Sequence, residues 1–358
     1  ISTRRGESHR AVTTVNAGWM VPTGRCPTVG IGGLTLGGGW GFFATAFGMT
    51  CDSLVATDVV LADGRVVTAD ATQHPDLFWA LRGGAGGNFG VNVSFTFRVH
   101  EPPPALTVVT ARWDLPRRLE ILDALLDLQI AGGGNPALRS KTVLTRAVEH
   151  PRDDDLAVET LGLFRGSPAE ARDALAPAFA VAKPESSSFR SVTYAQATRA
   201  FATWSPRGRF ESRNAFEGER MSVEGLEVAD RWFRRWPGGR IVPRNLGLHF
   251  PVGGAVRAVD PAATAFVHRG SNFLYQSEAV WHSADDRASV AEMLRWLRES
   301  WAAVAPHLES TAYQNFPDRA ITDWATAYYA GNYPRLQQVK AAYDPTSVFR
   351  YSQAIVPA

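Results

Sequence analysis

Residues 18–41 read GWMVPTGRCPTVGIGGLTLGGGWG, and the interpretation of the whole chain starts from this stretch. It holds a cluster of glycines, at positions 30, 32, 33, 37, 38, 39 and 41. Such a density makes a regular helix or strand costly, and fits a backbone that approaches a ligand closely or presents N–H groups to an anion. A flexible linker is the alternative, but linkers lack interleaved apolar side chains such as Ile31, Leu34 and Trp40. The sequence therefore predicts a ligand-cradling loop.

The spacing of the glycines excludes the common nucleotide-binding motifs. Gly30-x-Gly32 continues to Thr35, where a dinucleotide fingerprint requires a third glycine, and Gly84-x-Gly86 reaches Phe89. The lysines stand at positions 141, 183 and 340, and none follows a glycine, so the chain has no G-x-x-x-x-G-K phosphate loop. It also has no G-x-S-x-G elbow of a serine hydrolase.

Downstream of this loop, the pattern predicts a small β-rich unit. Residues 54–69 read as a hairpin, because two β-branched runs flank the turn dipeptide Asp63-Gly64. An amphipathic turn then leads into a second glycine-rich stretch, LRGGAGGNFG at 81–90. Residues 91–99 alternate strictly between apolar and polar side chains, which is typical of a half-buried strand. Three prolines follow Glu101 and predict a domain boundary, since proline cannot continue a strand ladder.

The character of the sequence changes after the boundary. We expect strands near 106–113, 141–149, 156–164, 244–251 and 273–281. We expect helices near 116–131, 167–181, 190–203, 222–235 and 284–304, the second of them opened by a Ser167…Glu170 capping box. Strands and helices that do not alternate strictly favour an α+β fold, with an antiparallel sheet backed by helices on one face. A further helix is expected near 334–342 in the tail.

Composition sets the outer limits. The chain has 358 residues, 45% hydrophobic and 20% charged, with a formal net charge of +2, which is typical of a globular protein with about two to three domains. Nothing in it indicates a nucleic-acid or membrane partner. Two cysteines and eight scattered histidines provide no disulfide framework and no metal-ligand spacing. The first ten residues lack the apolar run of a signal peptide, which favours a cytoplasmic location.

Three segments together resemble one family. They are GRCPTVGIGGLTLGGGWG at 24–41, LRGGAGGNFGV at 81–91 and YYAGNYPRLQQVKAAYDPTSVF at 328–349. In this order they are similar to the berberine-bridge-enzyme-like flavoprotein oxidases, of the vanillyl-alcohol-oxidase type with a PCMH-type FAD domain. The resemblance implies FAD as cofactor, oxygen as electron acceptor and a small-molecule alcohol, such as a sugar or a secondary metabolite, as substrate. It also implies an FAD-binding part at 1–103, a substrate-binding domain at 104–317 and a segment at 318–358 that returns to the FAD domain.

The resemblance also implies which residues hold the flavin. Cys26 matches the cysteine that forms a thioether to the isoalloxazine ring, and Val29 matches a small residue that leaves room for oxygen. Leu34 stands where some members have a flavin-contacting histidine. The remaining positions that match flavin-contacting residues are Thr28, Gly30, Gly32, Gly33, Asn88, Gly90 and Asn332.

For catalysis, the segment TAYQNFPD at 311–318 matches the family's tyrosine base, which here is Tyr313. A phenol has a pKa of about 10, so a base of this kind needs hydrogen bonds or positive charge to stabilise its anion. Packing as a cross-strand aromatic is the alternative for Tyr313. The family often has a second tyrosine shortly afterwards, where this chain has Phe316. Gln276 and Glu278 share one face of a predicted strand and match the family's polar substrate-side positions approximately.

One expected element has no match. Members of the family begin with another subdomain, whose R-S-G-G-H-type loop provides the second covalent flavin bond, and His9 in E-S-H-R does not fit it. We therefore expect this chain to lack the N-terminal lobe of the FAD domain, and its exposed apolar surface to favour self-association. A flavin-free pseudo-enzyme or binding module, which retains the substrate domain, is the alternative function.

Overall fold

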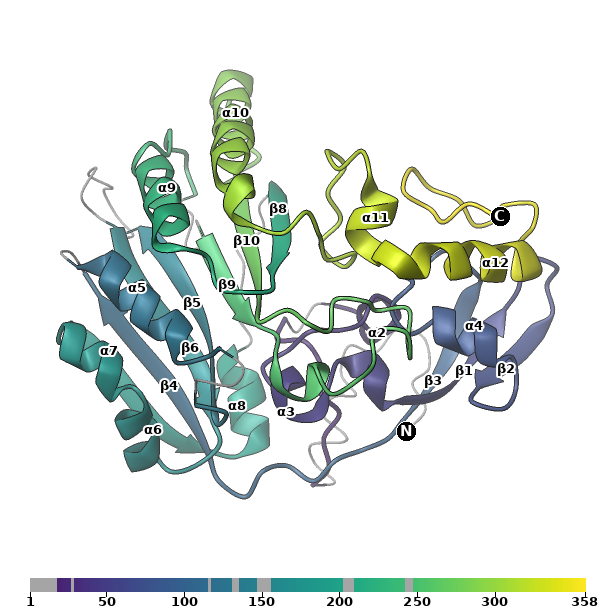
Figure 1. Cartoon of the computed structure of the whole chain (residues 1–358), viewed down its shortest axis with the longest axis horizontal. Helices are drawn as coiled ribbons and strands as arrows, with labels where there is room; N and C mark the ends of the chain where they lie inside the picture. Colours follow the sequence, from purple (N-terminus) through teal and green to yellow (C-terminus); the bar gives the residue numbers. More distant parts are fainter. Residues whose placement is uncertain are drawn as a thin grey trace.

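The computed structural model describes residues 18–26, 29–114, 117–130, 135–146, 156–201, 209–241 and 247–358. Over these residues the chain forms a three-stranded and a seven-stranded antiparallel sheet, with helices packed around both (Figure 1). The glycine-rich stretch, in purple, lies between the two sheets, and the C-terminal helices return to the small sheet (Figure 1). The predicted α+β class is confirmed.

The small sheet contains β1 (Leu54–Val60), β2 (Val66–Asp70) and β3 (Val91–Phe97), in the order β2-β1-β3. β1 and β2 form the predicted hairpin, with Val60 opposite Val66, and Gly64 adopts a φ of 84° in the turn. β1 also pairs with β3, the strand predicted from its alternation. Helix α4 (Pro75–Ala80) packs its buried side chains into the same core.

The glycine-rich stretch is more regular than its composition predicts. It contains the short helix α2 (Ile31–Leu36), and the short helix α3 (Ala44–Phe47) and the 3₁₀ turn η1 (Thr50–Ser53) follow it. The expectation that residues 30–41 avoid helix was therefore wrong for α2. Burial of Thr35 and Leu36 offsets the low helix propensity of glycine, and the helix ends before Gly38 and Gly39, whose φ angles are positive.

The large sheet has the strand order β7-β4-β6-β5-β9-β10-β8, and every neighbouring pair is antiparallel. In chain order its strands are β4 (Leu106–Trp113), β5 (Leu138–Arg146), β6 (Leu156–Phe164), β7 (Ser186–Val192), β8 (Arg209–Glu217), β9 (Gly247–Pro251) and β10 (Phe273–Trp281). The predicted antiparallel sheet is confirmed. The two edge strands, β7 and β8, were missed by the sequence prediction.

In the described part of the chain, helices cover one face of the large sheet. They are α5 (Arg118–Asp127), α6 (Pro168–Ala174), α7 (Ala176–Val181), α9 (Val223–Arg234) and α10 (Arg287–Val304). The predicted capping box opens α6: Glu170 N donates to Ser167 Oγ (3.3 Å), and Ser167 N donates to the Glu170 carboxylate (2.8 Å). Helix α8 (Tyr194–Phe201) packs on the opposite face.

Alternation along β10 separates the two faces of this sheet. Tyr275 enters the core beneath the helices, whereas Leu274 enters a second core together with Trp40 of the glycine stretch and Phe250 of β9. Trp40 Nε1 also donates to the carbonyl of Pro251 (2.7 Å), which ties the glycine stretch to β9. The face of the sheet opposite α5, α6, α7, α9 and α10 therefore meets the glycine stretch.

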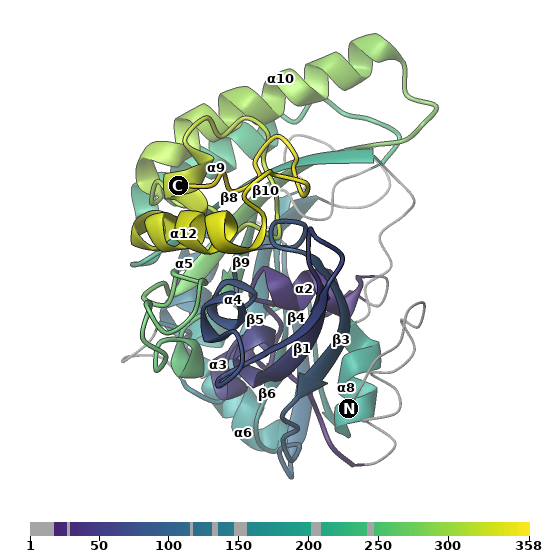
Figure 2. The same ribbon diagram turned by 90° about the vertical axis from the view of Figure 1, so that its right-hand side faces the viewer.

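The tail returns to the small sheet. The tail forms α11 (Trp324–Tyr329), η4 (Ala330–Asn332) and α12 (Tyr333–Tyr343). Two further 3₁₀ turns precede it, η2 (Gly254–Val256) before β10 and η3 (Ala305–His307) after α10. α12 lies against α4, as Figure 2 shows from the side. The fully buried Lys340 fixes this arrangement, because its Nζ donates to Asp344 Oδ2 and to the carbonyls of Asn88 and Phe349 at 2.6–2.7 Å.

Candidate functional site

Cys26 and Val29 lie just before the start of α2. Cys26 is a half-buried free thiol, its carbonyl accepts a hydrogen bond from Val29 N (3.3 Å), and the Val29 side chain is 49% exposed. Thr28, also predicted as a flavin contact, lies outside the described residues. An accessible thiol therefore stands at the entrance to the glycine-rich helix, as the resemblance requires.

Helix α2 is bare on one side. A Cβ added at Gly30 or Gly33 would meet no atom within 4 Å, whereas one at Gly32 would lie 3.2 Å from the Phe95 ring. The Gly32 side thus packs on the small sheet, and the other side exposes backbone with open space in front of it. A planar ring system can come into van der Waals contact with such a surface. These residues, with Cys26 beside them, fit the isoalloxazine of FAD.

Leu34 contributes only an apolar side chain to this region. Its methyl groups would lie 3.3–3.4 Å from a Cβ added at Gly24, so it fills the space behind the Cys26 segment. The polar contact that a histidine makes in some members is therefore not supplied by this residue. Its carbonyl is engaged elsewhere, accepting a hydrogen bond from Asn315 Nδ2 (2.9 Å).

Two of the residues predicted to contact the flavin, Asn88 and Gly90, make close contacts within the protein. The Asn88 side chain is fully buried: its Nδ2 donates to Gly84 O (2.8 Å) and Tyr351 Oη (3.0 Å), and its Oδ1 accepts from Ile355 N (3.0 Å). A Cβ at Gly90 would lie 2.5 Å from Val59, which shows that β1 already fills this space. The geometry gives both residues a structural role, and their flavin contacts stay a prediction.

Asn332 is the third such position. Its Nδ2 donates to the carbonyls of Pro261 (2.9 Å) and Thr264 (3.1 Å), so it links the start of α12 to the loop before β10. The amide is committed to these backbone groups. Like Asn88 and Gly90, Asn332 has a structural role in the fold, and its flavin contact stays a prediction.

Tyr313 is buried and hydrogen-bonded to the glycine-rich stretch. It is 2% exposed, and its Oη accepts hydrogen bonds from Gly39 N (2.9 Å), Trp40 N (3.1 Å) and Asn315 Nδ2 (3.0 Å). Burial raises the pKa of Tyr313 to about 12, although these three hydrogen bonds act in the opposite direction. Its acceptor positions are occupied, and the phenol stays neutral at physiological pH. These contacts support a role for Tyr313 in positioning the glycine loop, and its role as the base stays a prediction.

Gln276 and Glu278 lie where the sequence predicted, on one face of β10. Gln276 is opposite Leu248 of β9 and Asn214 of β8, and it shares its face with Leu274 of the second core. Glu278 is opposite Ser212 and is half-buried, while Gln276 is 5% exposed. Both side chains therefore belong to the face of the sheet that meets the glycine stretch.

A functional candidate missed by the sequence prediction is Lys141 of β5. It shares its face with Val143 of the second core, and it is 7% exposed. Burial and the charge of Arg25 lower the pKa of Lys141 to about 8, while Glu278, Glu159 and Cys26 raise it. Lys141 thus lies within electrostatic range of both Cys26 and the predicted substrate-side carboxylate. Its period-2 position beside Val143 was the signal that could have found it.

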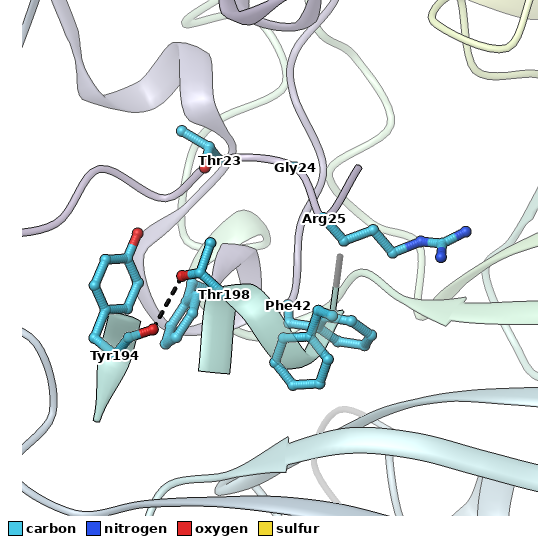
Figure 3. Close-up of a pocket in the computed structure, with 8 residues that line it drawn as sticks. Thr23, Gly24, Arg25, Phe42, Tyr194 and Thr198 are labelled. Atoms are coloured by element: carbon cyan, nitrogen blue, oxygen red, sulfur yellow. Dashed lines mark hydrogen bonds between the residues drawn. The ribbon is translucent and has the colours of Figure 1, made fainter. Parts of the chain in front are cut away.

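Aromatic side chains line a small pocket beside the segment that precedes Cys26. Figure 3 shows a pocket formed by Thr23, Gly24 and Arg25 on the Cys26 segment, by Phe42 and Phe43, and by Tyr194, Thr198 and Phe201 of α8. The Arg25 guanidinium stands 5.6 Å from the centroid of the Phe250 ring. The neighbourhood of the thiol therefore combines apolar surface with one positive charge.

Other kinds of site find no support in the described residues. No group of three or more histidine, cysteine, aspartate or glutamate side chains there is arranged to hold a metal ion. Across the same part of the chain, no helix is both long and apolar enough to span a membrane. The chemistry of the site therefore rests on the thiol, the bare helix and the polar face of the large sheet.

Comparisons with known proteins agree with this geometry. The profile of the FAD binding domain family matches residues 7–70, and the profile "Berberine and berberine like" matches residues 312–356. YgaK of Bacillus subtilis, an uncharacterised FAD-linked oxidoreductase, is 30% identical over 98% of this chain and 75% of its own length. The xylooligosaccharide oxidase of Thermothelomyces thermophilus is 30% identical over 94% of this chain and 69% of its own length.

Solved structures show the same relationship. The Physcomitrella patens BBE-like 1 variant D396N superposes with a TM-score of 0.84 at 25% identity, covering 97% of this chain and 75% of that one. The xylooligosaccharide oxidase from Myceliophthora thermophila, solved with xylobiose, gives a TM-score of 0.82 at 26% identity, covering 100% and 78%. The matches extend over both sheets and the returning tail. The chain therefore belongs to the berberine-bridge-enzyme-like family of FAD-linked oxidoreductases, with FAD as its cofactor.

Proposed function

We propose that the chain is an oxidase that converts an alcohol group of a small molecule to a carbonyl group and delivers the electrons to oxygen. One observation carries the proposal. Arg25, next to Cys26, lies over the ring of Phe250, on the sheet face that also presents Gln276 and Glu278, and α2 exposes its backbone a few residues further along the chain. A flat cofactor on α2 would meet a polar substrate on the sheet face. When bound, FAD supplies the hydride acceptor and the route of electrons to oxygen.

Cys26 is the proposed attachment point of the flavin. Its thiol is accessible, whereas Cys51 is fully buried and burial raises the pKa of its thiol. In the attachment, an S–C bond replaces an S–H bond and a ring C–H bond, and oxygen takes up the two electrons. Val29, small and exposed beside the thiol, leaves room for oxygen.

On the substrate side, we assign Gln276 and Glu278 to binding and orienting the reacting hydroxyl. The Gln276 amide can donate to the substrate oxygen and the Glu278 carboxylate can accept from a hydroxyl. Tyr313 positions the loop that carries Gly39 and Trp40, and through it the aromatic wall of the site.

The proposed substrate is a sugar or an aromatic secondary metabolite. Phe316, half-buried and packed against Phe250, gives the site an aromatic side chain on which either kind of molecule can stack. Relatives of both kinds are known: chitooligosaccharide oxidase is 30% identical, and the monolignol oxidoreductase AtBBE-like 13 is 27% identical.

The test is turnover with a panel of oligosaccharides and aromatic alcohols. In the absence of oxygen, a true substrate bleaches the flavin absorbance near the visible maximum, and admitting air restores the colour with one hydrogen peroxide per turnover. Gln276→Leu and Glu278→Gln should raise KM or slow bleaching, while Glu292→Gln, on the exposed side of α10, serves as control. Bleaching by NADH alone, without any response to alcohols, would refute the alcohol oxidase proposal.

We also infer that the chain self-associates through the outer part of β3. Val91 and Val93 are 54% and 48% exposed at this edge of the small sheet, an unusual exposure for neighbouring valines. Light scattering after size-exclusion chromatography should give a mass above that of one chain, reduced by Val91→Asp. A monomer at all concentrations contradicts the inference.

A further inference from the structure

A cavity of about 300 Å³ lies at the end of the large sheet where β8 begins and β10 ends. Two of its lining residues, Trp281 of β10 and Arg209 of β8, are directly opposite each other in the sheet. Alternation places both on the face of Ala279, whose side chain lies in the core beneath the helices. Gln276 and Glu278 are on the other face. The cavity is therefore separate from the residues that we assign to the substrate of the oxidation.

Helix α10 forms the second wall of the cavity, where it packs over β10 and β8 (Figure 1). Its lining residues are Arg287, Val290, Ala291 and Leu294, a spacing that puts all four on one side of the helix. The apolar side chains of this wall and the half-buried indole of Trp281 offer surfaces to a flat apolar group. A volume of this size is at the lower end of ligand pockets and suits a molecule with one or two rings.

The cavity also carries positive charge that the protein leaves unpaired. Arg209 and Arg287 are exposed, and neither guanidinium has a hydrogen-bond or ion-pair partner among the described residues. His282 adds a further donor to the lining. Its Nδ1 accepts a hydrogen bond from Ala284 N (3.1 Å), which leaves the hydrogen of the neutral ring on Nε2.

The acidic side chains beside the cavity are already engaged. Asp285, whose side chain is 4% exposed, accepts a hydrogen bond from His282 N (2.8 Å) and pairs with Arg240 (3.4 Å). Asp286 caps α10 by accepting from Ser289 N (2.8 Å). An anion that enters the cavity therefore meets two free guanidinium groups, while the nearby carboxylates are held by their own partners.

We propose that this cavity binds a small aromatic carboxylate. Its ring lies between Trp281 and the apolar side of α10, and its carboxylate is bound by the guanidinium groups of Arg209 and Arg287. Guanidinium groups suit this role because they match the two oxygens of a carboxylate with paired N–H donors. Binding here involves no group of the proposed oxidation and needs no flavin.

The first test compares two probes, cinnamate and its uncharged counterpart cinnamamide, by isothermal titration calorimetry on the protein as purified. Cinnamate should bind with a dissociation constant of about 0.1–1 mM, as expected for a ligand of this size. Cinnamamide should bind about tenfold more weakly or worse, because it loses the charge-assisted hydrogen bonds. Added salt should weaken the binding of cinnamate more than that of cinnamamide. Equal affinities for the two probes would overturn the proposal.

The second test locates the probe with variants of α10. Arg287→Gln should weaken cinnamate about tenfold and leave cinnamamide unchanged. Ala291→Phe keeps both arginines but fills the cavity from an exposed position, so it should weaken both probes. Arg295→Gln is the matched control: this arginine is exposed on the same helix, pairs with Glu292 and does not line the cavity. It should bind both probes like the wild type.

Melting temperatures without ligand show that each variant is folded, which the exposure of the three altered side chains favours. If Arg287→Gln and Ala291→Phe bind cinnamate as tightly as the wild type, the probe occupies another part of the molecule and the proposal is overturned. A wild-type protein that binds no cinnamate at millimolar concentration overturns it as well. These results are independent of whether the chain oxidises alcohols, because the titration measures binding alone.

Discussion

Replacing Tyr313 with phenylalanine tests whether this residue positions the glycine loop or acts as the base. The change removes only the hydroxyl, which accepts from Gly39 N, Trp40 N and Asn315 Nδ2. Asn315 keeps its bond to Leu34 O, but the two backbone amides lose the acceptor that the structure gives them. A buried donor without a partner costs about 1–3 kcal/mol, so we expect a loss of about 2–4 kcal/mol in the free energy of unfolding.

Tyr275 provides the matched control. It is also a buried tyrosine, 1% exposed, but its Oη has no hydrogen-bond partner among the described residues. Tyr275→Phe removes an unpaired polar atom and should leave stability unchanged or slightly increased. The assay is urea denaturation followed by tryptophan fluorescence, with the covalent flavin content of each variant measured in parallel.

The two roles for Tyr313 give opposite results. If Tyr313 is a positioning residue, Tyr313→Phe should unfold at a lower urea concentration than the wild type. The flavin that remains bound should still be reduced by substrate at a rate within about tenfold of the wild type. As a base, the variant would be as stable as the wild type but reduced about 100-fold more slowly or worse. The second pattern would refute the reasoning from the three donors.

Three further changes test separate parts of the account. Gly33→Leu should fold at least as stably as the wild type, because open space faces this helical position, yet lose bound FAD; retained FAD contradicts the placement of the cofactor. Lys340→Met should lower the free energy of unfolding by about 3–5 kcal/mol, measured by urea denaturation, because it leaves Asp344 buried without its cation. An unchanged urea midpoint would show that the pair is dispensable. Lys141→Met should raise the free energy of unfolding by about 3 kcal/mol at pH 7, because folding lowers the pKa of this lysine from its ordinary value of 10.5 to about 8. Between these two pH values the unfolded chain binds more protons than the folded chain. Wild-type stability should therefore rise with pH across that window and the variant's should not.

Local features of the fold could be predicted from the sequence. The Asp63-Gly64 hairpin, the alternating strand β3 and the capping box of α6 each depend on residues a few positions apart. β7 and β8 were missed because both are edge strands with polar sequences, SSSFRSV and RFESRNAFE, whose pairing is decided by neighbours distant in sequence. Helix α2 was missed because burial of its C-terminal turn outweighs the propensity of its glycines.

The residues of the candidate site also fall into those that local sequence could predict and those that depend on distant neighbours. Cys26 and the glycines of α2 form a continuous motif, so their role as a ligand surface could be anticipated. The partners of Asn88 lie more than 260 residues away, at Tyr351 and Ile355, and only the fold shows that its amide is already used. The alternation beside Val143 could have placed Lys141 on a buried strand face, but its neighbours Arg25 and Glu278 come from distant segments that only the fold brings together.

The central claim is that FAD lies against the bare face of α2 and is joined to Cys26. The most direct measurement is to denature the purified protein in acid, digest it, and determine the mass of the peptide that contains Cys26. We expect a yellow precipitate and a Cys26 peptide heavier by the mass of a flavin in the wild type and in Cys51→Ala, and a colourless precipitate without any flavin-modified peptide in Cys26→Ala. A colourless protein whose Cys26 thiol is free, and which binds no added FAD, would contradict the account and favour a flavin-free module.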